Sequence, residues 1–203
     1  MIAVIDYGVG NLFSLVSSLN KIGADVVVTS DVDVIKKADK LILPGVGAFR
    51  DASNKLVSSG LDKVVLEQVN SGKPLMGICL GMQLLFDKSY EHGEYDGLGI
   101  IKGKVVPILD VAKDVKIPHM GWNALTFKNA KSEIFKYLNE GDFVYFVHSY
   151  FAMVEDSNDL SSVTDYTVEI TASVQKGNVY GCQFHPEKSG ETGLKILKAF
   201  NEL

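Results

Sequence analysis

Residues 73–86 read KPLMGICLGMQLLF, and this stretch joins a strand pattern to a helix pattern at a cysteine. The apolar run from Pro74 to Ile78 is typical of a buried strand, and a helical apolar pattern begins at Leu80. Cys79 lies at the join, with a glycine two residues to either side. Glycines leave room where a sharp turn brings backbone segments close together. The stretch therefore predicts a cysteine version of the strand–turn–helix elbow that carries nucleophiles.

The position of Cys79 favours a catalytic role. A helix N-terminus stabilises a thiolate through its dipole and its unpaired N–H groups, and the same N–H groups can bind an oxyanion. The alternative is a small buried apolar side chain, as many single cysteines are, but the bracket of Gly77 and Gly81 favours catalysis. Cys182 lies in an apolar run over residues 179–184 without such a turn, so we assign it to packing.

Upstream of this turn, short apolar runs alternate with helical patterns. Runs rich in Ile, Val and Leu predict strands at residues 1–6, 25–30, 40–43 and 74–78. Helical spacing lies between them at residues 11–22, 31–37 and 48–70, the last broken at Ser58-Ser59-Gly60. Strands that are apolar along their length and separated by helices indicate a parallel sheet covered on both faces.

Downstream, the pattern changes to closely spaced strands. We expect them at residues 99–108, 115–117, 124–127, 143–148, 151–154, 162–166, 169–176 and 179–184, with helices at 132–138 and 190–201. Such strands pair antiparallel, because a parallel return needs a crossover of a dozen or more residues. Lys176-Gly177-Asn178 fits a hairpin turn. No repeat or long polar linker interrupts the chain, so we expect one α/β domain over residues 1–203, with a mainly parallel sheet and additional antiparallel strands.

Composition excludes several classes of protein. The 203 residues carry 25 acidic and 20 basic side chains, and the 46% hydrophobic content is that of a folded chain. No Lys or Arg run exceeds two residues, which argues against a nucleic-acid surface. No uncharged stretch is long enough to span a bilayer. Two cysteines and the lack of a secretion-signal pattern indicate a cytoplasmic protein.

A thiol nucleophile needs a base, and the base needs a group that orients it. His185 follows the last predicted strand, in the run Gln183-Phe184-His185-Pro186-Glu187. Pro186 keeps His185 extended, and positions two apart in extended chain face the same side, so Glu187 can lie beside His185. Cys79 and His185 both end predicted strands, at the edge where open α/β sheets build their sites. Taken singly, His185 and Glu187 fit surface positions; together with Cys79 they predict a Cys–His–Glu triad.

The remaining histidines and glycine loops do not suggest a cofactor. His92 lies in a polar loop, whereas His119 and His148 lie among apolar residues and fit structural positions. No HExxH, CxxC or equivalent spacing occurs, so we expect no metal. Gly8-Val9-Gly10 and Gly45-Val46-Gly47 follow strands but complete neither GxGxxG nor a P-loop, so we expect no nucleotide cofactor.

The motif GICLGMQ at residues 77–83, together with HPE at 185–187, resembles the triad-type (class I) glutamine amidotransferases. In that family the cysteine attacks the side-chain amide of glutamine and ammonia is released. Further motifs resemble the branch that serves a (β/α)8-barrel synthase of histidine biosynthesis: DYGVGN (6–11), PGVGAF (44–49), PHMGWN (118–123), YFVHSY (145–150) and QFHPEKS (183–189). These motifs span nearly the whole chain. The resemblance implies a three-layer α/β/α domain.

The resemblance also implies a role for each matching residue. Cys79 would be the nucleophile, His185 the general base and then acid, and Glu187 its orienting group. The Leu80 N–H would form the oxyanion hole with an N–H from the loop of Gly45, Val46 and Gly47. The substrate would be held by Gln83, Glu91 and the backbone of Ser149 and Tyr150. The surface facing the synthase would be lined or adjoined by Gly10, Asn11, His119, Met120, Trp122, Tyr145 and Lys188, although Trp122 and Tyr145 also fit core positions.

The implied reaction is hydrolysis of L-glutamine to glutamate and ammonia through a cysteine thioester. The ammonia would pass to a barrel subunit that makes imidazole glycerol phosphate and an aminoimidazole carboxamide ribonucleotide. Such a barrel needs about 200 residues or more of its own, so we expect a separate partner chain in a heterodimer. Three alternatives stay open: a glutaminase serving a pyridoxal phosphate or surface-sugar synthase, a cysteine hydrolase acting on peptides, and a non-catalytic subunit that only docks a partner.

Overall fold

The computed structural model describes residues 1–129 and 131–203. Its central sheet has the strand order β2-β1-β3-β4-β14-β13-β12-β9. Strands β1 to β4 and β14 pair in parallel, and β13, β12 and β9 continue the sheet antiparallel. The bounds are β1 (Ile2–Ile5), β2 (Val26–Thr29), β3 (Lys40–Leu43), β4 (Leu75–Ile78), β9 (Thr126–Phe127), β12 (Leu160–Asp165), β13 (Glu169–Lys176) and β14 (Val179–Cys182).

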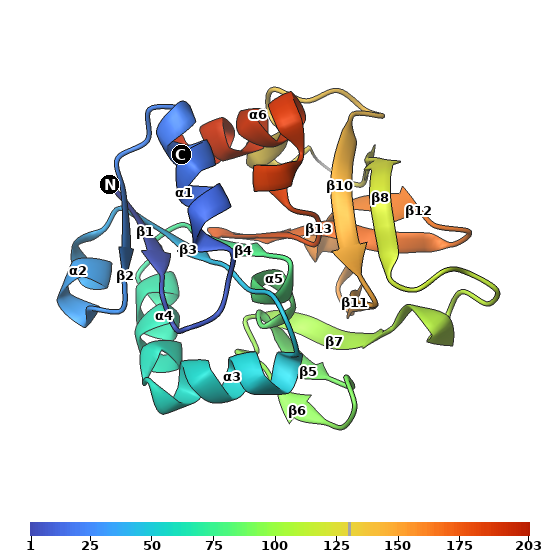
Figure 1. Cartoon of the computed structure of the whole chain (residues 1–203), viewed down its shortest axis with the longest axis horizontal. Helices are drawn as coiled ribbons and strands as arrows, with labels where there is room; N and C mark the ends of the chain where they lie inside the picture. The colour runs from blue at the N-terminus through green and yellow to red at the C-terminus, as the bar shows by residue number, and fades with distance from the viewer. Residues whose placement is uncertain (130) are drawn as a thin grey trace.

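Helices cover both faces of this sheet. They are α1 (Leu12–Lys21), α2 (Val32–Lys37), α3 (Phe49–Ser58), α4 (Leu61–Asn70) and α6 (Gly190–Asn201). In Figure 1, α1 and α6 lie above the sheet, and α3 and α4 lie below it. Alternate residues of β1 serve the two sides, because Ile2 and Val4 pack in the core with α1 and α6 while Ala3 and Ile5 pack in the core with α3 and α4. This two-sided burial confirms the α/β architecture, with a mainly parallel sheet between helical layers.

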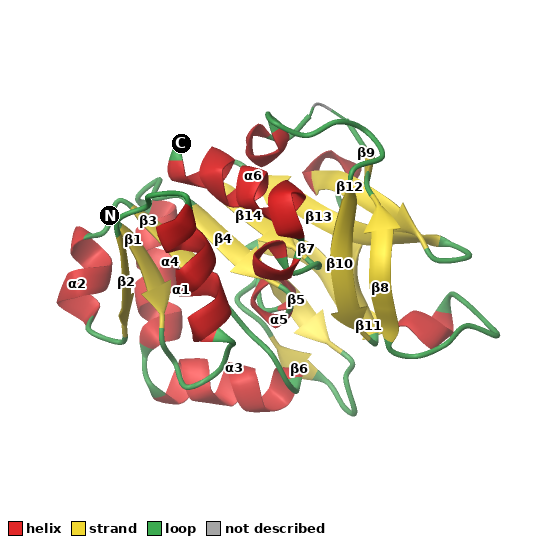
Figure 2. Cartoon of the chain, turned by 45° about the horizontal axis from the view of Figure 1, so that its top comes forward, coloured by secondary structure: helices red, strands yellow, loops and turns green. Residues whose placement is uncertain are grey.

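Two smaller sheets extend the central one (Figure 2). One has the order β11-β7-β5-β6, and the other pairs β10 with β8. Their bounds are β5 (Phe86–Ser89), β6 (Tyr95–Asp96), β7 (Ile101–Pro107), β8 (His119–Ala124), β10 (Phe143–His148) and β11 (Tyr150–Val154). Strands β10 and β11 follow each other directly but pair with different partners, so the intervening Ser149 lies where the two small sheets meet.

Most predicted elements are confirmed. The long helical pattern does break before Gly60, whose left-handed φ of 74° separates α3 from α4. The hairpin at Lys176-Gly177-Asn178 is present, since Lys176 pairs with Val179 across β13 and β14. Within the described residues, no helix combines the length and apolar character that crossing a membrane requires.

Several local predictions are wrong. Residues 115–117 form no strand, because no neighbouring strand pairs with them. Residues 132–138 form only the 3-10 turn η2 (Glu133–Phe135), which suffices to bury Ile134, Phe135 and Leu138. The strand expected at residues 124–127 is divided between the end of β8 and β9. The rest of β8 was not predicted, and its pairing with β10 begins at His119, opposite His148. The helix after Cys79 is a single turn, α5 (Leu80–Gln83), after which the chain passes into β5.

Candidate active site

The turn at Cys79 is sharp and held from both sides. Cys79 has φ 54° and ψ −110°, a conformation that non-glycine residues rarely adopt. Its N–H donates to the Cys182 carbonyl oxygen at 2.7 Å, and its own carbonyl accepts from the Gln83 N–H at 3.1 Å. A Cβ at Gly77 would lie 2.7 Å from the Gly81 carbonyl oxygen, and a Cβ at Gly81 would overlap the Leu43 carbonyl oxygen. The two glycines are therefore required by the close backbone approach at the elbow.

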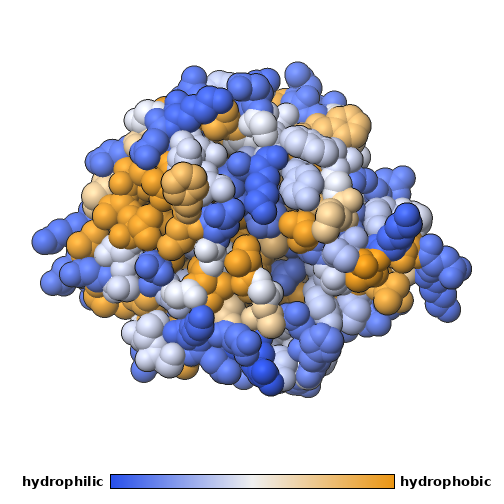
Figure 3. All heavy atoms as spheres, in the orientation of Figure 1, coloured by the Kyte–Doolittle hydropathy of each residue, from blue (hydrophilic) through white to orange (hydrophobic). Residues whose placement is uncertain are grey.

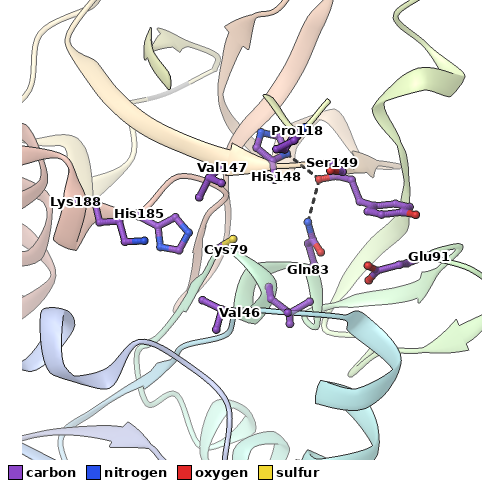
Figure 4. Close-up of a pocket in the computed structure, with 13 residues that line it drawn as sticks. Val46, Cys79, Gln83, Glu91, Pro118, Val147, His148, Ser149, His185 and Lys188 are labelled. Atoms are coloured by element: carbon purple, nitrogen blue, oxygen red, sulfur yellow. Dashed lines mark hydrogen bonds between the residues drawn. The ribbon is translucent and has the colours of Figure 1, made fainter. Parts of the chain in front are cut away.

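The parallel pairing of β4 with β14 brings His185 to Cys79. Cys182 lies opposite Ile78 in this register, so the two chains leave the sheet at the same edge. The His185 N–H then donates to the Tyr145 carbonyl oxygen on β10 at 3.0 Å, which fixes the backbone of the histidine. Figure 4 shows the side chains of Cys79 and His185 side by side at the cavity.

His185 and Glu187 form a buried pair. The His185 Nδ1 and the Glu187 Oε1 are 2.7 Å apart, and the two side chains are only 3% and 4% exposed. Burial opposes the charged imidazole, but hydrogen bonding and charge interactions with Cys79 and Glu187 outweigh it and raise the pKa of His185 from 6.5 to about 9. We expected an extended chain from His185 to Glu187. His185 itself is extended, but Glu187 reaches it through the 3-10 turn η4 (Pro186–Lys188).

A cavity of about 330 Å³ opens in front of the triad, a size that accommodates a small metabolite. Cys79 and His185 lie on its wall together with the four predicted substrate-binding residues, Gln83, Glu91, Ser149 and Tyr150. The complete lining is Val46, Gly47, Cys79, Leu80, Gln83, Glu91, Pro118, Val147, His148, Ser149, Tyr150, His185 and Lys188. Glu187 stands behind His185, outside this lining.

The predicted oxyanion-hole residues lie together. Leu80 is the first residue of α5, and Val46 and Gly47 line the cavity opposite it. A Cβ at Gly45 would lie 2.8 Å from the Gly81 backbone N and 2.9 Å from Tyr7 Oη, so the loop packs directly on the start of α5. Backbone N–H groups from both segments can thus face the same part of the cavity.

The predicted substrate-binding residues have partners of their own. Gln83 donates its side-chain amide to the Tyr150 carbonyl oxygen at 3.0 Å, which Figure 4 shows as a dashed line. Glu91 accepts the N–H of Phe49, the first residue of α3, at 2.6 Å through Oε2. This contact holds Glu91 at the opposite end of the cavity from His185 in Figure 4.

The predicted partner-facing residues differ in exposure. Met120, Trp122 and Lys188 are exposed, and Tyr145 packs edge-on against Trp122 with ring centroids 6.0 Å apart. His119, the first residue of β8, has a buried side chain, so it adjoins this surface without lining it. Gly10 and Asn11 are half-buried; a Cβ on Gly10 would lie 3.2 Å from Pro44 Cβ, and Asn11 bonds Ser14.

Sequence reasoning missed Pro118 and Val147 of the cavity lining and three polar residues of the site. Tyr7 donates its hydroxyl to the Pro44 carbonyl oxygen at 2.6 Å, His148 lines the cavity, and Gln183 donates to Cys79 Sγ at 3.7 Å. Gln183 was accessible to sequence analysis, since it lies two positions before His185 near the end of a strand and so faces the same side. Tyr7 and His148 carried no such signal.

Metal coordination finds little support in the described part of the chain. Residues 1–129 and 131–203 bring no three His, Cys, Asp or Glu side chains into an arrangement that could hold a metal ion.

Comparison with known proteins identifies the family. A model of the family described as glutamine amidotransferase class-I matches residues 3–202. The chain belongs to the class I glutamine amidotransferases. Among its relatives, proteins named imidazole glycerol phosphate synthase subunit HisH are 51% identical in Caldanaerobacter subterraneus subsp. tengcongensis and 52% identical in Aquifex aeolicus. The matches cover 100% and 97% of this chain and 98% and 94% of those relatives.

Solved structures show the class I amidotransferase fold independently. A glutamine amidotransferase is similar with a TM-score of 0.76 at 15% identity, covering 100% of both chains. PurLQS from Thermotoga maritima is similar with a TM-score of 0.74 at 21% identity, covering 98% of this chain and 96% of that one. At these identities the likeness establishes the amidotransferase fold alone.

Proposed function

We propose that this chain is the glutaminase subunit of an imidazole glycerol phosphate synthase and hydrolyses L-glutamine through Cys79. The observation that carries the proposal is the buried His185–Glu187 pair facing a cysteine on a strained turn, at the wall of a cavity of metabolite size. Relatives of about 50% identity over the full chain carry the name of that subunit.

The proposed reaction begins at the amide carbon of glutamine. The Cys79 thiolate attacks that carbon, and the resulting oxyanion accepts hydrogen bonds from the Leu80 N–H and from an N–H of the 45–47 loop. The His185 imidazolium gives its proton to the amide nitrogen, the C–N bond breaks, and ammonia leaves a thioester on Cys79. His185 then takes a proton from water, whose oxygen attacks the thioester and releases glutamate and the thiolate.

The cavity offers a separate place for the amino-acid end of glutamine. Glu91 can pair with the α-ammonium group, and the backbone at Ser149 and Tyr150 can bind the polar groups next to it. Gln83 uses both hydrogens of its amide within the protein, so its oxygen is the atom left to contact substrate. We therefore propose that the side-chain amide of glutamine lies at the Cys79 end.

We propose that the partner is a (β/α)8-barrel synthase chain in a heterodimer and receives the ammonia. Trp122 on β8 is 52% exposed and Phe13 on α1 is 85% exposed, and exposed apolar groups of this size are typical of interfaces. Apolar groups also gather over the side where α1 and β2 lie (Figure 3). Contacts of η4 with α1 and with β10 join these elements into one surface next to His185.

Since a nucleophilic thiol must stay reduced, we propose that the protein works in the cytoplasm.

Glutamate release tests this proposal directly. We expect the chain mixed with its barrel subunit, and with the nucleotide ligand of that subunit, to release glutamate from L-glutamine, and Cys79→Ala to abolish the release. The control is Cys182→Ala, which alters the buried cysteine of β14 and should keep the activity. Activation only by a pyridoxal phosphate synthase or a surface-sugar synthase would show that the chain serves that pathway instead. Equal glutamate release by wild type and Cys79→Ala would overturn the catalytic role of Cys79.

A further inference from the structure

A line of hydrogen bonds runs from a backbone carbonyl to the sulfur of Cys79. The Tyr150 carbonyl oxygen accepts from Gln83 Nε2 at 3.0 Å, and Gln83 Nε2 also donates to Gln183 Oε1 at 3.0 Å. Gln183 Nε2 then donates to Cys79 Sγ at 3.7 Å, within the range of hydrogen bonds to sulfur. Both glutamines are buried, Gln183 completely, so water does not replace these contacts.

The direction of every bond in this line follows from the carbonyl at its start. A carbonyl oxygen can only accept, so the Gln83 amide must turn its NH2 group toward Tyr150. That NH2 group can only donate, so Gln183 must turn its oxygen toward Gln83. The NH2 group of Gln183 is thereby left facing the sulfur. The opposite orientation of Gln183 would turn its NH2 group toward the NH2 group of Gln83, so that two donors would face each other. It would also turn its oxygen toward the sulfur of Cys79.

His148 fixes the carbonyl itself. Its Nδ1 lies 2.8 Å from the Tyr150 oxygen and must donate to it, so this oxygen is held by two donors. Burial lowers the pKa of His148 to about 3, despite the bond to Tyr150, and the ring is neutral at physiological pH. The neutral ring thus carries its single proton on Nδ1, toward the Tyr150 oxygen.

We infer that Gln183 is a thiolate-binding residue of the glutaminase reaction, held in its donating orientation by Gln83 and the Tyr150 carbonyl. An amide N–H favours the charged over the neutral form of an acceptor, so Gln183 stabilises Cys79 as a thiolate in addition to the N-terminus of α5. Gln83 accordingly has a second task besides contacting substrate. This inference deepens the proposed function and rests on Cys79 being its nucleophile.

Alkylation of the free chain tests the inference without glutamine or partner. The rate of Cys79 modification by iodoacetamide is measured against pH, with mass mapping to separate it from the buried Cys182. In Gln183→Met, which keeps the length of the side chain but has no N–H, we expect the midpoint of the pH profile to rise by about one unit. The rate well below the midpoint then falls about tenfold. The control is Gln175→Met on β13, away from the cavity, which should keep the wild-type profile.

A second variant separates orientation from substrate binding. Gln83→Met frees the amide of Gln183 to rotate, so we expect the midpoint of the alkylation profile to rise in this variant too. A role of Gln83 confined to holding glutamine predicts no change, because no glutamine is present. Unchanged midpoints in both variants, with melting temperatures showing that they fold, would overturn the inference. If the midpoint shifts in the variants but the wild-type chain never releases glutamate, the proposed function is contradicted. The hydrogen bond from Gln183 to the sulfur of Cys79 is then still supported.

Discussion

At the scale of single residues, the site depends on which buried groups carry charge. His185 is buried, which disfavours an imidazolium, yet Cys79 and Glu187 raise its pKa to about 9. The protonated ring can give its proton to departing ammonia at neutral pH. In the proposed mechanism this pair prepares the acid of the first half-reaction, and it also contributes to stability.

The pH dependence of stability follows from that shift. Because folding raises the pKa of His185 from 6.5 to about 9, the pair stabilises the folded chain below pH 6.5, and this contribution is lost as the pH rises through about 9. We expect Glu187→Gln to lower the free energy of unfolding by about 1–3 kcal/mol below pH 6.5, and the deficit to shrink toward pH 9. Urea unfolding of wild type and variant from pH 5.5 to 9.5 measures it. Glu191→Gln, at an exposed position on α6, is the control, and a deficit independent of pH would refute the argument.

Tyr7 is expected to position the loop at the oxyanion hole. Burial raises the pKa of its hydroxyl, which therefore stays a donor to the Pro44 carbonyl next to Gly45. Tyr7→Phe leaves this carbonyl without its donor, so we expect kcat for glutamine hydrolysis in the complex to fall about tenfold with KM nearly unchanged. Steady-state kinetics measure both constants, with the exposed Tyr137→Phe as control. A raised KM at unchanged kcat would show that Tyr7 serves substrate binding instead.

At the scale of elements, α5 is short for a helix that presents the proposed nucleophile. Its single turn, Leu80–Gln83, cannot supply the dipole of a long helix, so local N–H groups and the hydrogen bond from Gln183 are left to stabilise the thiolate. Its place is fixed by backbone packing, since Gly81 touches the end of β3 and Gly77 touches the turn of α5 itself.

Replacing the second glycine tests this packing. In Gly81→Ala the added methyl group overlaps the Leu43 carbonyl oxygen, so β3 or α5 must move. We expect a loss of about 2–4 kcal/mol in the free energy of unfolding and at least a hundredfold loss of glutaminase activity. Gly23→Ala is the matched control, because open space surrounds Gly23 and only its left-handed φ of 75° costs about 1 kcal/mol. Equal losses in the two variants would contradict the argument that overlap with the Leu43 carbonyl oxygen requires glycine at position 81.

At the scale of the whole molecule, the sheet unites distant parts of the chain. Strand β4 from the first half pairs with β14 from near the C-terminus, and β14 continues into β13 and β12. The core on the α1 and α6 side likewise joins residues from both ends, such as Leu15 and Phe200, with Phe146 of the β8–β10 sheet. We propose on this basis that residues 1–203 fold as one domain.

A single domain should unfold in one cooperative step. The sole tryptophan, Trp122, reports on the β8–β10 sheet, whereas far-ultraviolet circular dichroism reports on all helices and strands. We expect the two signals to give the same urea midpoint and the same slope. An earlier fluorescence midpoint would show that the β8–β10 sheet unfolds independently. Trp122→Phe, followed by circular dichroism alone, checks that the probe itself does not alter the transition.

The elements that have local causes were predictable from the order of residues alone. The apolar runs of β1 to β4, the break at Gly60 and the glycine bracket of Cys79 follow from patterns within a few residues, as does the adjacency of His185 and Glu187. The amidotransferase family was also recognisable from its motifs, and the comparisons confirm it.

Features that depend on contacts between distant segments could not be predicted from the sequence and are visible only in the folded chain. The pairing of β8 with β10, the lack of a strand at residues 115–117 and the turn that replaces a helix at 132–138 each depend on neighbours far away in sequence. The line of hydrogen bonds from Tyr150 through Gln83 and Gln183 to Cys79 also depends on residues far apart in sequence. A hydrogen bond has a direction that both partners must satisfy in space, and the order of residues along a chain does not record that geometry.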